Sequence, residues 1–266
     1  MIHIETRGNF CFATLDAPAT RNALTDAMVR DLLAAVERAG ASPTTRALIL
    51  RGKGPAFCAG GDFSRFRELI AAEPGAVDPI VGFNRAFGSL LEGLHDAPIA
   101  TIAVLEGAAF GGGVGLAASC DFVLAAGNAE LATPEVTLGL PPAQIAPFIA
   151  ARLGETAALH LLLTGRRLTA ADAHVCGLVD EVVAAEQIEN RLDALLAQLT
   201  RAEPAALRAT KAIVQHRRTH AMRDTLDFAA RQFAAALRSG APSEGLAAFA
   251  ARRKPAWAQG DEGTPP

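Results

Sequence analysis

Residues 99–126 have the sequence IATIAVLEGAAFGGGVGLAASCDFVLAA, in which two apolar runs flank a turn with three successive glycines. Apolar and β-branched runs bounded by glycine are typical of buried strands. A glycine-rich turn after a strand is suited to open a helix, whose first N–H groups have no acceptor within the helix. We therefore predict a strand at 99–107, a glycine turn at 110–115 and a second strand at 121–126.

The alternation of strand and helix extends from this stretch to the N-terminus. Further strands are expected at residues 2–5, 10–16 and 46–52. A helix capped by Thr25 or Asp26 is expected over 25–37, and another over about 82–94. This order of elements predicts an α/β fold in which βα units stack on a sheet.

The character of the chain changes near residue 185, after which amphipathic stretches rich in Ala, Leu and Arg replace the strand-like runs. We predict a core with the functional site at 1–185, a helical region at 186–258 and a disordered tail at 259–266. Residues 240–244 (GAPSE) predict a break before a last helix, which Pro255 ends.

Composition excludes several classes of function. The chain has 266 residues and a formal net charge of −3, so it lacks the basic field that nucleic acid requires. The N-terminus lacks the order of a signal peptide, and no apolar run is long enough to span a membrane. Four widely spaced cysteines without a CxxC pair favour a reducing cytoplasm: Cys11, Cys58, Cys120 and Cys176.

Two glycine-rich turns are the strongest chemical feature. FCAGGD (Phe57–Asp62) follows one predicted strand and FGGGVG (Phe110–Gly115) follows another. Two such turns side by side can aim two backbone N–H groups at one oxygen, which is how an oxyanion hole is built. The alternative is that the glycines only make tight turns. A dinucleotide fingerprint also fits the second turn, but Glu135 then follows a proline instead of the next strand.

The ionisable side chains give weaker signals. Glu135 lies in the run ELATPEVTLGL, where a lone glutamate is usually exposed to solvent. His216 and His220 have the spacing of a metal pair on a helix, but no HExxH pattern accompanies them. We therefore expect no metal site.

Taken together, these segments resemble the enoyl-CoA hydratase/isomerase, or crotonase, superfamily over nearly the whole chain. Six motifs occur in the family's order and spacing: RNAL (21–24), FCAGGD (57–62), EGAAFGGGVGLAASCD (106–121), TPEVTLGL (133–140), LLLTGRRLTAADAHVCGLVDEVV (161–183) and EGLAAFAARRKPAW (244–257). The resemblance implies a core of stacked ββα units and C-terminal helices that form a homotrimer, often as a dimer of trimers.

The resemblance also implies an acyl-CoA site. It assigns the oxyanion donors to the N–H groups of Gly61 and Gly112 and the acid/base role to Glu135. The residues that it places against the acyl-CoA substrate are Arg21, Ala23, Ala59, Asp62, Phe63, Gly111, Phe249 and Lys254. Of these, Arg21, Phe249 and Lys254 are expected to meet the adenine or phosphates of CoA. CoA would enter as part of the substrate, without any metal or redox cofactor.

The chain departs from the best-known hydratases of this family at one position. Those enzymes carry a second glutamate where this chain has Gly115, and a single glutamate is the pattern of the enoyl-CoA isomerases. Residues 84–91 (NRAFGSLL) and 139–148 (GLPPAQIAPF), in contrast, resemble bacterial hydratases of branched methylglutaconyl- and isohexenylglutaconyl-CoA thioesters.

Three functions follow from these observations. The first is a hydratase acting on a branched 2-enoyl-CoA, the second an isomerase that shifts a double bond with one glutamate, and the third a non-catalytic protein that binds acyl-CoA. Arg65 and Arg67 are candidates to bind an anionic acyl terminus, although their positions also fit solvated helix residues.

Overall fold

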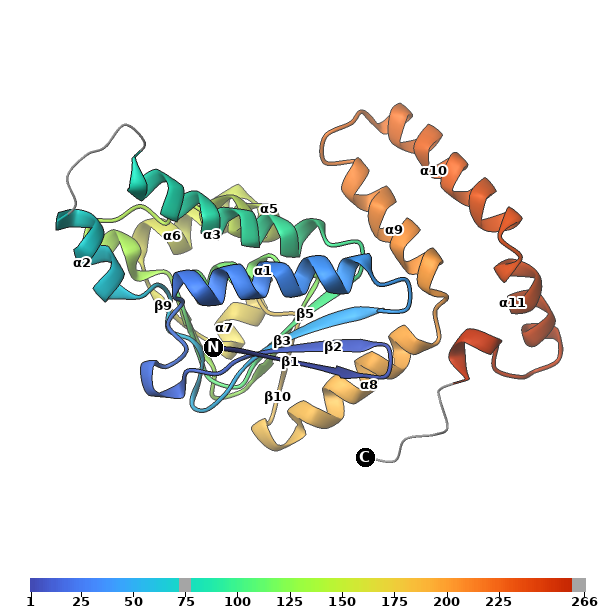
Figure 1. Cartoon of the computed structure of the whole chain (residues 1–266), viewed down its shortest axis with the longest axis horizontal. Helices are drawn as coiled ribbons and strands as arrows, with labels where there is room; N and C mark the ends of the chain where they lie inside the picture. The colour runs from blue at the N-terminus through green and yellow to red at the C-terminus, as the bar shows by residue number, and fades with distance from the viewer. Residues whose placement is uncertain (72–77, 260–266) are drawn as a thin grey trace.

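A six-stranded sheet forms the centre of the chain in the computed structural model, which describes residues 1–71 and 78–259 (Figure 1). Its strands are β1 (Ile2–Arg7), β2 (Phe10–Leu15), β3 (Ala47–Gly52), β5 (Ala100–Leu105), β7 (Phe122–Ala126) and β10 (Glu181–Val183), in the order β1-β2-β3-β5-β7-β10. β1 is antiparallel to β2, and every other neighbouring pair is parallel. The five strands predicted from sequence are confirmed.

A second, smaller sheet was not predicted. Its strands have three residues each, namely β4 (Ala56–Cys58), β6 (Ala108–Phe110), β8 (Glu130–Ala132) and β9 (Arg167–Thr169), in that order. β4, β6 and β8 are parallel, and each follows a strand of the large sheet after a short link. The chain therefore repeats a ββα unit, which carries the end of each short strand to the same edge.

The helices follow the strands. They are α1 (Asp26–Ala41), α2 (Phe63–Ala71), α3 (Pro79–Asp96), α4 (Gly112–Ala118), α5 (Ala146–Leu153), α6 (Glu155–Thr164), α7 (Ala170–Val175), α8 (Ile188–Thr200), α9 (Pro204–His216), α10 (Met222–Arg238) and α11 (Ala241–Ala250). Four short 3-10 turns complete the described elements: η1 (Pro18–Thr20), η2 (Pro134–Leu138), η3 (Ala185–Gln187) and η4 (Ala256–Ala258).

The predicted cap of the first helix is confirmed, and the helix boundaries differ from those expected. Thr25 Oγ1 accepts a hydrogen bond from Met28 N at 3.3 Å, so Thr25 caps α1. α3 begins at Pro79, before the expected residue 82, because Asp78 caps it and proline is tolerated in the first helical turn. The predicted break before the last helix is confirmed but lies at Ser239 and Gly240, the latter with φ 84°. Residues 241–244 already belong to α11, because proline is tolerated in its first turn, and the helix ends at Ala250, before Pro255.

The inner parallel strands of the large sheet are buried on both faces, as expected for parallel strands, whereas the antiparallel edge strand β1 is mostly exposed. Along β3, Leu48 and Leu50 pack on the side of α1 and α3, whereas Ala47 and Ile49 pack against α8. All four of these side chains have no exposed surface. The core thus holds the short strands, and the turns that follow them, in fixed places.

The C-terminal helices α10 and α11 form an arm that stands away from the sheet (Figure 1). Large apolar side chains on the arm remain exposed: Met222, Leu226, Phe233, Leu237, Leu246 and Phe249. None of the helices within 1–71 and 78–259 is long and apolar enough to cross a membrane. Residues 260–266, most of the predicted tail, lie outside the described residues.

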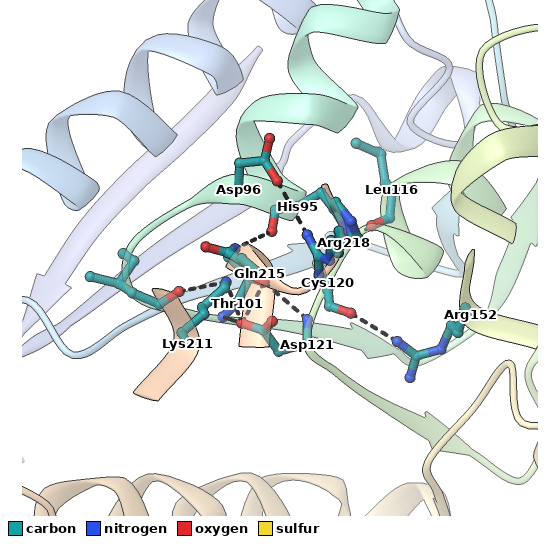
Figure 2. A network of polar contacts seen from close by, with 11 residues as sticks. His95, Asp96, Thr101, Leu116, Cys120, Asp121, Arg152, Lys211, Gln215 and Arg218 are labelled. Carbon is teal, nitrogen blue, oxygen red and sulfur yellow. Dashed lines mark hydrogen bonds and ion pairs between the residues drawn. The ribbon is translucent and has the colours of Figure 1, made fainter. Parts of the chain in front are cut away.

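A polar network fixes α9, the base of this arm, to the core (Figure 2). Lys211 Nζ donates to Asp121 Oδ2 at 2.6 Å and to the Ile99 carbonyl at 2.9 Å. The same Asp121 oxygen accepts from Thr101 N at 2.9 Å and from Thr101 Oγ1 at 3.1 Å. Because the Thr101 and Lys211 side chains are largely buried, the Asp121 carboxylate is the acceptor on which the network depends.

Asp121→Ala should lower the free energy of unfolding by about 2–3 kcal/mol, because it removes the acceptor of two buried Thr101 donors and leaves the Lys211 ammonium with only the Ile99 carbonyl. Urea denaturation at equal protein concentrations measures the loss. The matched control is Asp96→Ala, which removes a 3.3 Å pair with Arg218 at the surface and should cost less than about 1 kcal/mol. Equal losses in the two variants would contradict the assignment.

Candidate active site

Three turns meet at one edge of the small sheet because β4, β6 and β8 are parallel neighbours. Gly61, Gly112 and Glu135 each lie two or three residues beyond the end of one of these strands. A Cβ atom built on Gly60 would lie 3.7 Å from Gly112 N, and one built on Gly111 would lie 2.7 Å from Glu135 Oε1. The structure therefore brings together the three residues that the sequence predicted as catalytic.

The N–H groups of Gly61 and Gly112 have no acceptor within the described part of the chain. Gly61 forms a parallel bridge with Leu24, in which Leu24 N donates to Gly60 O at 2.8 Å and Asp62 N donates to Leu24 O at 3.2 Å. In such a bridge the N–H of Gly61 itself points away from Leu24. Gly112 is the first residue of α4, so its N–H has no acceptor within the helix.

Glycine is required where these turns approach each other. Gly60 has φ 95° and Gly111 has φ 49°, backbone conformations that other residues rarely adopt. A side chain on Gly111 would also collide with the Glu135 carboxylate. Gly60 and Gly111 therefore make the turns and also leave space for the Glu135 carboxylate next to the N–H groups of Gly61 and Gly112.

Glu135 is held by a short turn and partly buried. Pro134 opens η2, and Gly139 closes it in the left-handed region. Glu135 Oε2 is buried and has no hydrogen-bond partner among the described residues. Burial raises the pKa of this carboxyl above its ordinary value of 4.5. A carboxyl with a buried, unpartnered oxygen and a raised pKa is suited to accept and return a proton.

Apolar side chains surround the two free donors. A Cβ atom on Gly61 would lie 2.7 Å from the Phe66 ring, and one on Gly112 would lie 3.2 Å from both Leu24 and Phe87. Phe66 packs edge-on against Phe83 at 5.8 Å between ring centroids. Low local polarity strengthens hydrogen bonds to a developing negative charge. Sequence analysis did not assign Phe66 or Phe87, although the spacing of Phe83 and Phe87 is that of one helical face.

Ile145 fills the space next to Gly115, the position at which the best-known hydratases carry a second glutamate. Gly115 is buried in α4, and a Cβ atom there would lie 2.3 Å from Ile145 Cγ2 and 3.4 Å from Leu91 Cδ1. Ile145 is itself only 3% exposed. A longer side chain at Gly115 therefore requires Ile145 to move.

Five of the other predicted site residues lie in or beside the Gly61 turn: Arg21, Ala23, Ala59, Asp62 and Phe63. Arg21 is exposed, but its carbonyl accepts from Ala59 N at 2.9 Å. Ala23 is half-buried next to Leu24. Asp62 accepts from Ser64 N and Ser64 Oγ at 2.9 and 2.6 Å, which lower the pKa of this carboxyl. Phe63 begins α2, and its side chain lies outside what the structure describes.

Two predicted residues are not brought to the site within one chain. Phe249 on α11 is 84% exposed, and Lys254 follows the same helix on the surface. Both belong to the arm, which lies at the opposite end of the molecule from α2 (Figure 1).

His216, His220 and Arg65 have structural partners, whereas Arg67 is exposed on α2. The rings of His216 and His220 stack at 3.7 Å between centroids, and His216 Nδ1 lies 3.1 Å from Thr225 Oγ1. No group of three His, Cys, Asp or Glu side chains in the described residues is placed to hold a metal. Arg65 is paired with Asp26 at 3.4 Å and with Glu68 at 3.0 Å.

Fold and site together define an enzyme of the crotonase superfamily. The family model described as enoyl-CoA hydratase/isomerase matches residues 5–260, and the chain belongs to that family. A probable enoyl-CoA hydratase of Rhizobium meliloti (strain 1021) is 34% identical over 253 residues, which cover 94% of this chain and 95% of that protein.

Solved structures agree. An enoyl-CoA hydratase/isomerase from Marinobacter aquaeolei has a TM-score of 0.93 at 37% identity, over 97% of this chain and 99% of that chain. Pseudomonas aeruginosa AtuE has a TM-score of 0.93 at 42% identity, with the same coverage. The superfamily expected from the motifs is therefore confirmed.

Glu135→Gln should stabilise the fold at neutral pH. Because the folded-state pKa is raised, the folded protein binds more protons than the unfolded chain between pH 4.5 and the folded pKa, so wild-type stability falls as pH rises through that window. Glutamine does not titrate. Below pH 4.5 the variant and wild type should have the same free energy of unfolding. Above the folded-state pKa of Glu135 the variant should be more stable by about 1.4 kcal/mol per unit of pKa shift. Urea denaturation at several pH values measures the difference. An advantage that does not depend on pH would contradict a buried carboxylate.

Gly115→Ala should lower the free energy of unfolding by about 1–3 kcal/mol, because the added methyl group overlaps Ile145. In a double-mutant cycle with Ile145→Ala, the two losses should be less than additive, since truncating Ile145 vacates the volume that the methyl group needs. The control is Gly82→Ala, which lies in open space on α3 and should stabilise by about 1 kcal/mol. Additive losses would show that Ile145 does not fill the Gly115 position.

Proposed function

We propose that this protein is an enoyl-CoA hydratase that adds water across the 2,3 double bond of a branched acyl-CoA thioester. The observation that carries the proposal is the Glu135 carboxylate, with one buried oxygen that has no partner among the described residues, beside the two free N–H groups of Gly61 and Gly112. Two donors directed at one position are suited to a thioester oxygen, which becomes negative as the enolate forms. Each such donor contributes about 3 kcal/mol to the transition state in comparable sites.

Glu135 performs both proton transfers in this reaction. Its carboxylate takes a proton from water as the oxygen of that water bonds to C3, and the electrons of the double bond move onto the thioester oxygen. The enolate then collapses, and C2 receives the proton from Glu135. One water is added in total, on one face of the double bond. A raised pKa suits both steps, because the carboxyl must accept the proton and then release it.

This chemistry moves only water and protons, so it requires neither a metal nor a redox cofactor, and CoA takes part only as the substrate's carrier. The free thiols of the four cysteines support a cytoplasmic location.

An isomerase is the second candidate, and one observation favours it. Ile145 occupies the volume at Gly115, so no second glutamate lies at that position, where plain hydration commonly uses one. In that reaction Glu135 would take a proton from one carbon and return it two carbons away, without adding water.

The acyl chain is proposed to be branched and to end in a carboxylate. Gln144 Nε2 donates to Asn84 Oδ1 at 2.7 Å, and the Gln144 amide packs against Gly88, one residue beyond Phe87. Asn84 retains two amide N–H donors, which suit an acceptor oxygen. These residues belong to the segments 84–91 and 139–148, whose sequences resemble glutaconyl-CoA hydratases. Arg65 is less suitable, since Asp26 and Glu68 already pair with it.

The proposal includes a homotrimer or a dimer of trimers. Leu226, Phe233 and Leu237 on α10 are each more than half exposed, and helical spacings of seven and four residues place them on one face. Burial of this face between copies would bring the arm of one chain against a neighbour. Phe249 and Lys254 would then meet the CoA of the neighbouring site, which the single chain does not allow.

Three thioesters test the function: crotonyl-CoA, 3-methylcrotonyl-CoA and 3-methylglutaconyl-CoA. We expect 3-methylglutaconyl-CoA to lose its enoyl absorbance fastest and to gain the mass of one water. Glu135→Gln should lower kcat by about 100-fold or more, because acid/base groups contribute at least that much.

The same assay in heavy water distinguishes the alternatives. Deuterium incorporation with a shifted double bond and no gain of water would establish the isomerase instead. Tight binding of all three thioesters without turnover would contradict both reactions.

A further inference from the structure

Asn22 is a fully buried polar side chain close to the candidate oxyanion turn. It has no exposed surface, and its φ of 58° lies in the left-handed region. Its amide makes three hydrogen bonds: Oδ1 accepts from Ala17 N at 2.8 Å, and Nδ2 donates to Lys53 O at 3.0 Å and to Ala56 O at 2.8 Å. The proposed chemistry does not use this residue, and sequence analysis gave it no role.

The hydrogen-bond partners of Asn22 lie in two segments next to the Gly61 turn, the loop at 17–24 and the link at 53–56. Ala17 precedes η1 and the loop that contains Asn22 itself. Lys53 and Ala56 flank the link from β3 to β4, the strand that leads directly to Gly61. One amide therefore joins the loop at 17–24 to the chain entering the turn.

Three backbone hydrogen bonds continue this connection into the turn. Ala59 N donates to Arg21 O at 2.9 Å, Leu24 N to Gly60 O at 2.8 Å and Asp62 N to Leu24 O at 3.2 Å. The bond to Gly60 O holds the peptide that joins Gly60 to Gly61. Because a peptide is planar, fixing its carbonyl fixes the direction of its N–H.

We propose that Asn22 is a positioning residue for the oxyanion hole: its three hydrogen bonds hold the loop whose backbone aims the Gly61 N–H at the thioester oxygen. This inference rests on the proposed function, because it assumes that Gly61 donates to a thioester. A displacement of about 1 Å at a reacting group can lower a rate by about 100-fold.

Asn22→Gly is the test variant, because glycine keeps the left-handed backbone and removes only the amide. Two quantities are measured per folded molecule: kcat and KM for the best thioester, and the absorption maximum of bound 4-dimethylaminocinnamoyl-CoA. The second requires no turnover. An aromatic enoyl thioester absorbs at longer wavelength when donors polarise its carbonyl, so its shift reports the oxyanion hole directly.

We expect Asn22→Gly to lower kcat by about 10- to 100-fold, with KM changed less than threefold, and to lose most of the red shift. Asn22→Ser, which keeps a hydroxyl where the amide was, should give a smaller change in the same direction, and it keeps the test available if the glycine variant does not fold. The control is Thr101→Val, which removes a buried hydroxyl in the network beneath α9 (Figure 2). It should destabilise the fold while leaving kcat and the red shift unchanged.

Two results would overturn the inference. A red shift and a kcat per folded molecule within twofold of wild type in both Asn22 variants would make Asn22 purely structural. An unshifted spectrum with the wild-type protein would contradict the oxyanion hole itself, and with it the proposed function.

Discussion

The close approach of three strand ends is the constraint on which the rest of the structure depends. β4, β6 and β8 must lie side by side so that the N–H groups of Gly61 and Gly112 face the carboxylate of Glu135. The space between the turns admits no side chain at Gly111. The large sheet and its helices hold these short strands, which are too short to form a stable sheet alone.

The fold stabilises an arrangement that is locally unfavourable. A carboxylate with an unpartnered buried oxygen costs free energy when it ionises, and the raised pKa of Glu135 expresses that cost. Burial of the sheet on both faces offsets it. The same low polarity that penalises the carboxylate strengthens the interaction of the two N–H groups with a developing charge. Low polarity around the turns therefore both destabilises the ionised Glu135 carboxylate and strengthens the two N–H donors.

Packing also decides which chemistry the site can support. At Gly115 the backbone of α4 has the place for a second carboxylate, but Ile145 from another segment occupies the volume. The loop that carries Ile145 also carries Gln144, whose amide pairs with Asn84. The segment at 144–145 thus excludes a carboxylate at Gly115 through Ile145 and supplies a neutral polar pair, Gln144 with Asn84.

The sequence by itself determined the α/β class, the five long strands and the glycine turns, because periodicity and glycine spacing are local properties of the chain. The choice of Gly61, Gly112 and Glu135 as site residues came instead from the resemblance to the crotonase superfamily. It did not reveal β4, β6 and β8, since three residues carry no measurable period. Only the tertiary structure decided that Asn22 ties two segments together, that Ile145 fills the space at Gly115, and that α11, which carries Phe249, lies at the opposite end of the molecule from α2. Those relations join residues 30 or more positions apart, and a contact across such a separation depends on how the sheets stack, which no local pattern specifies.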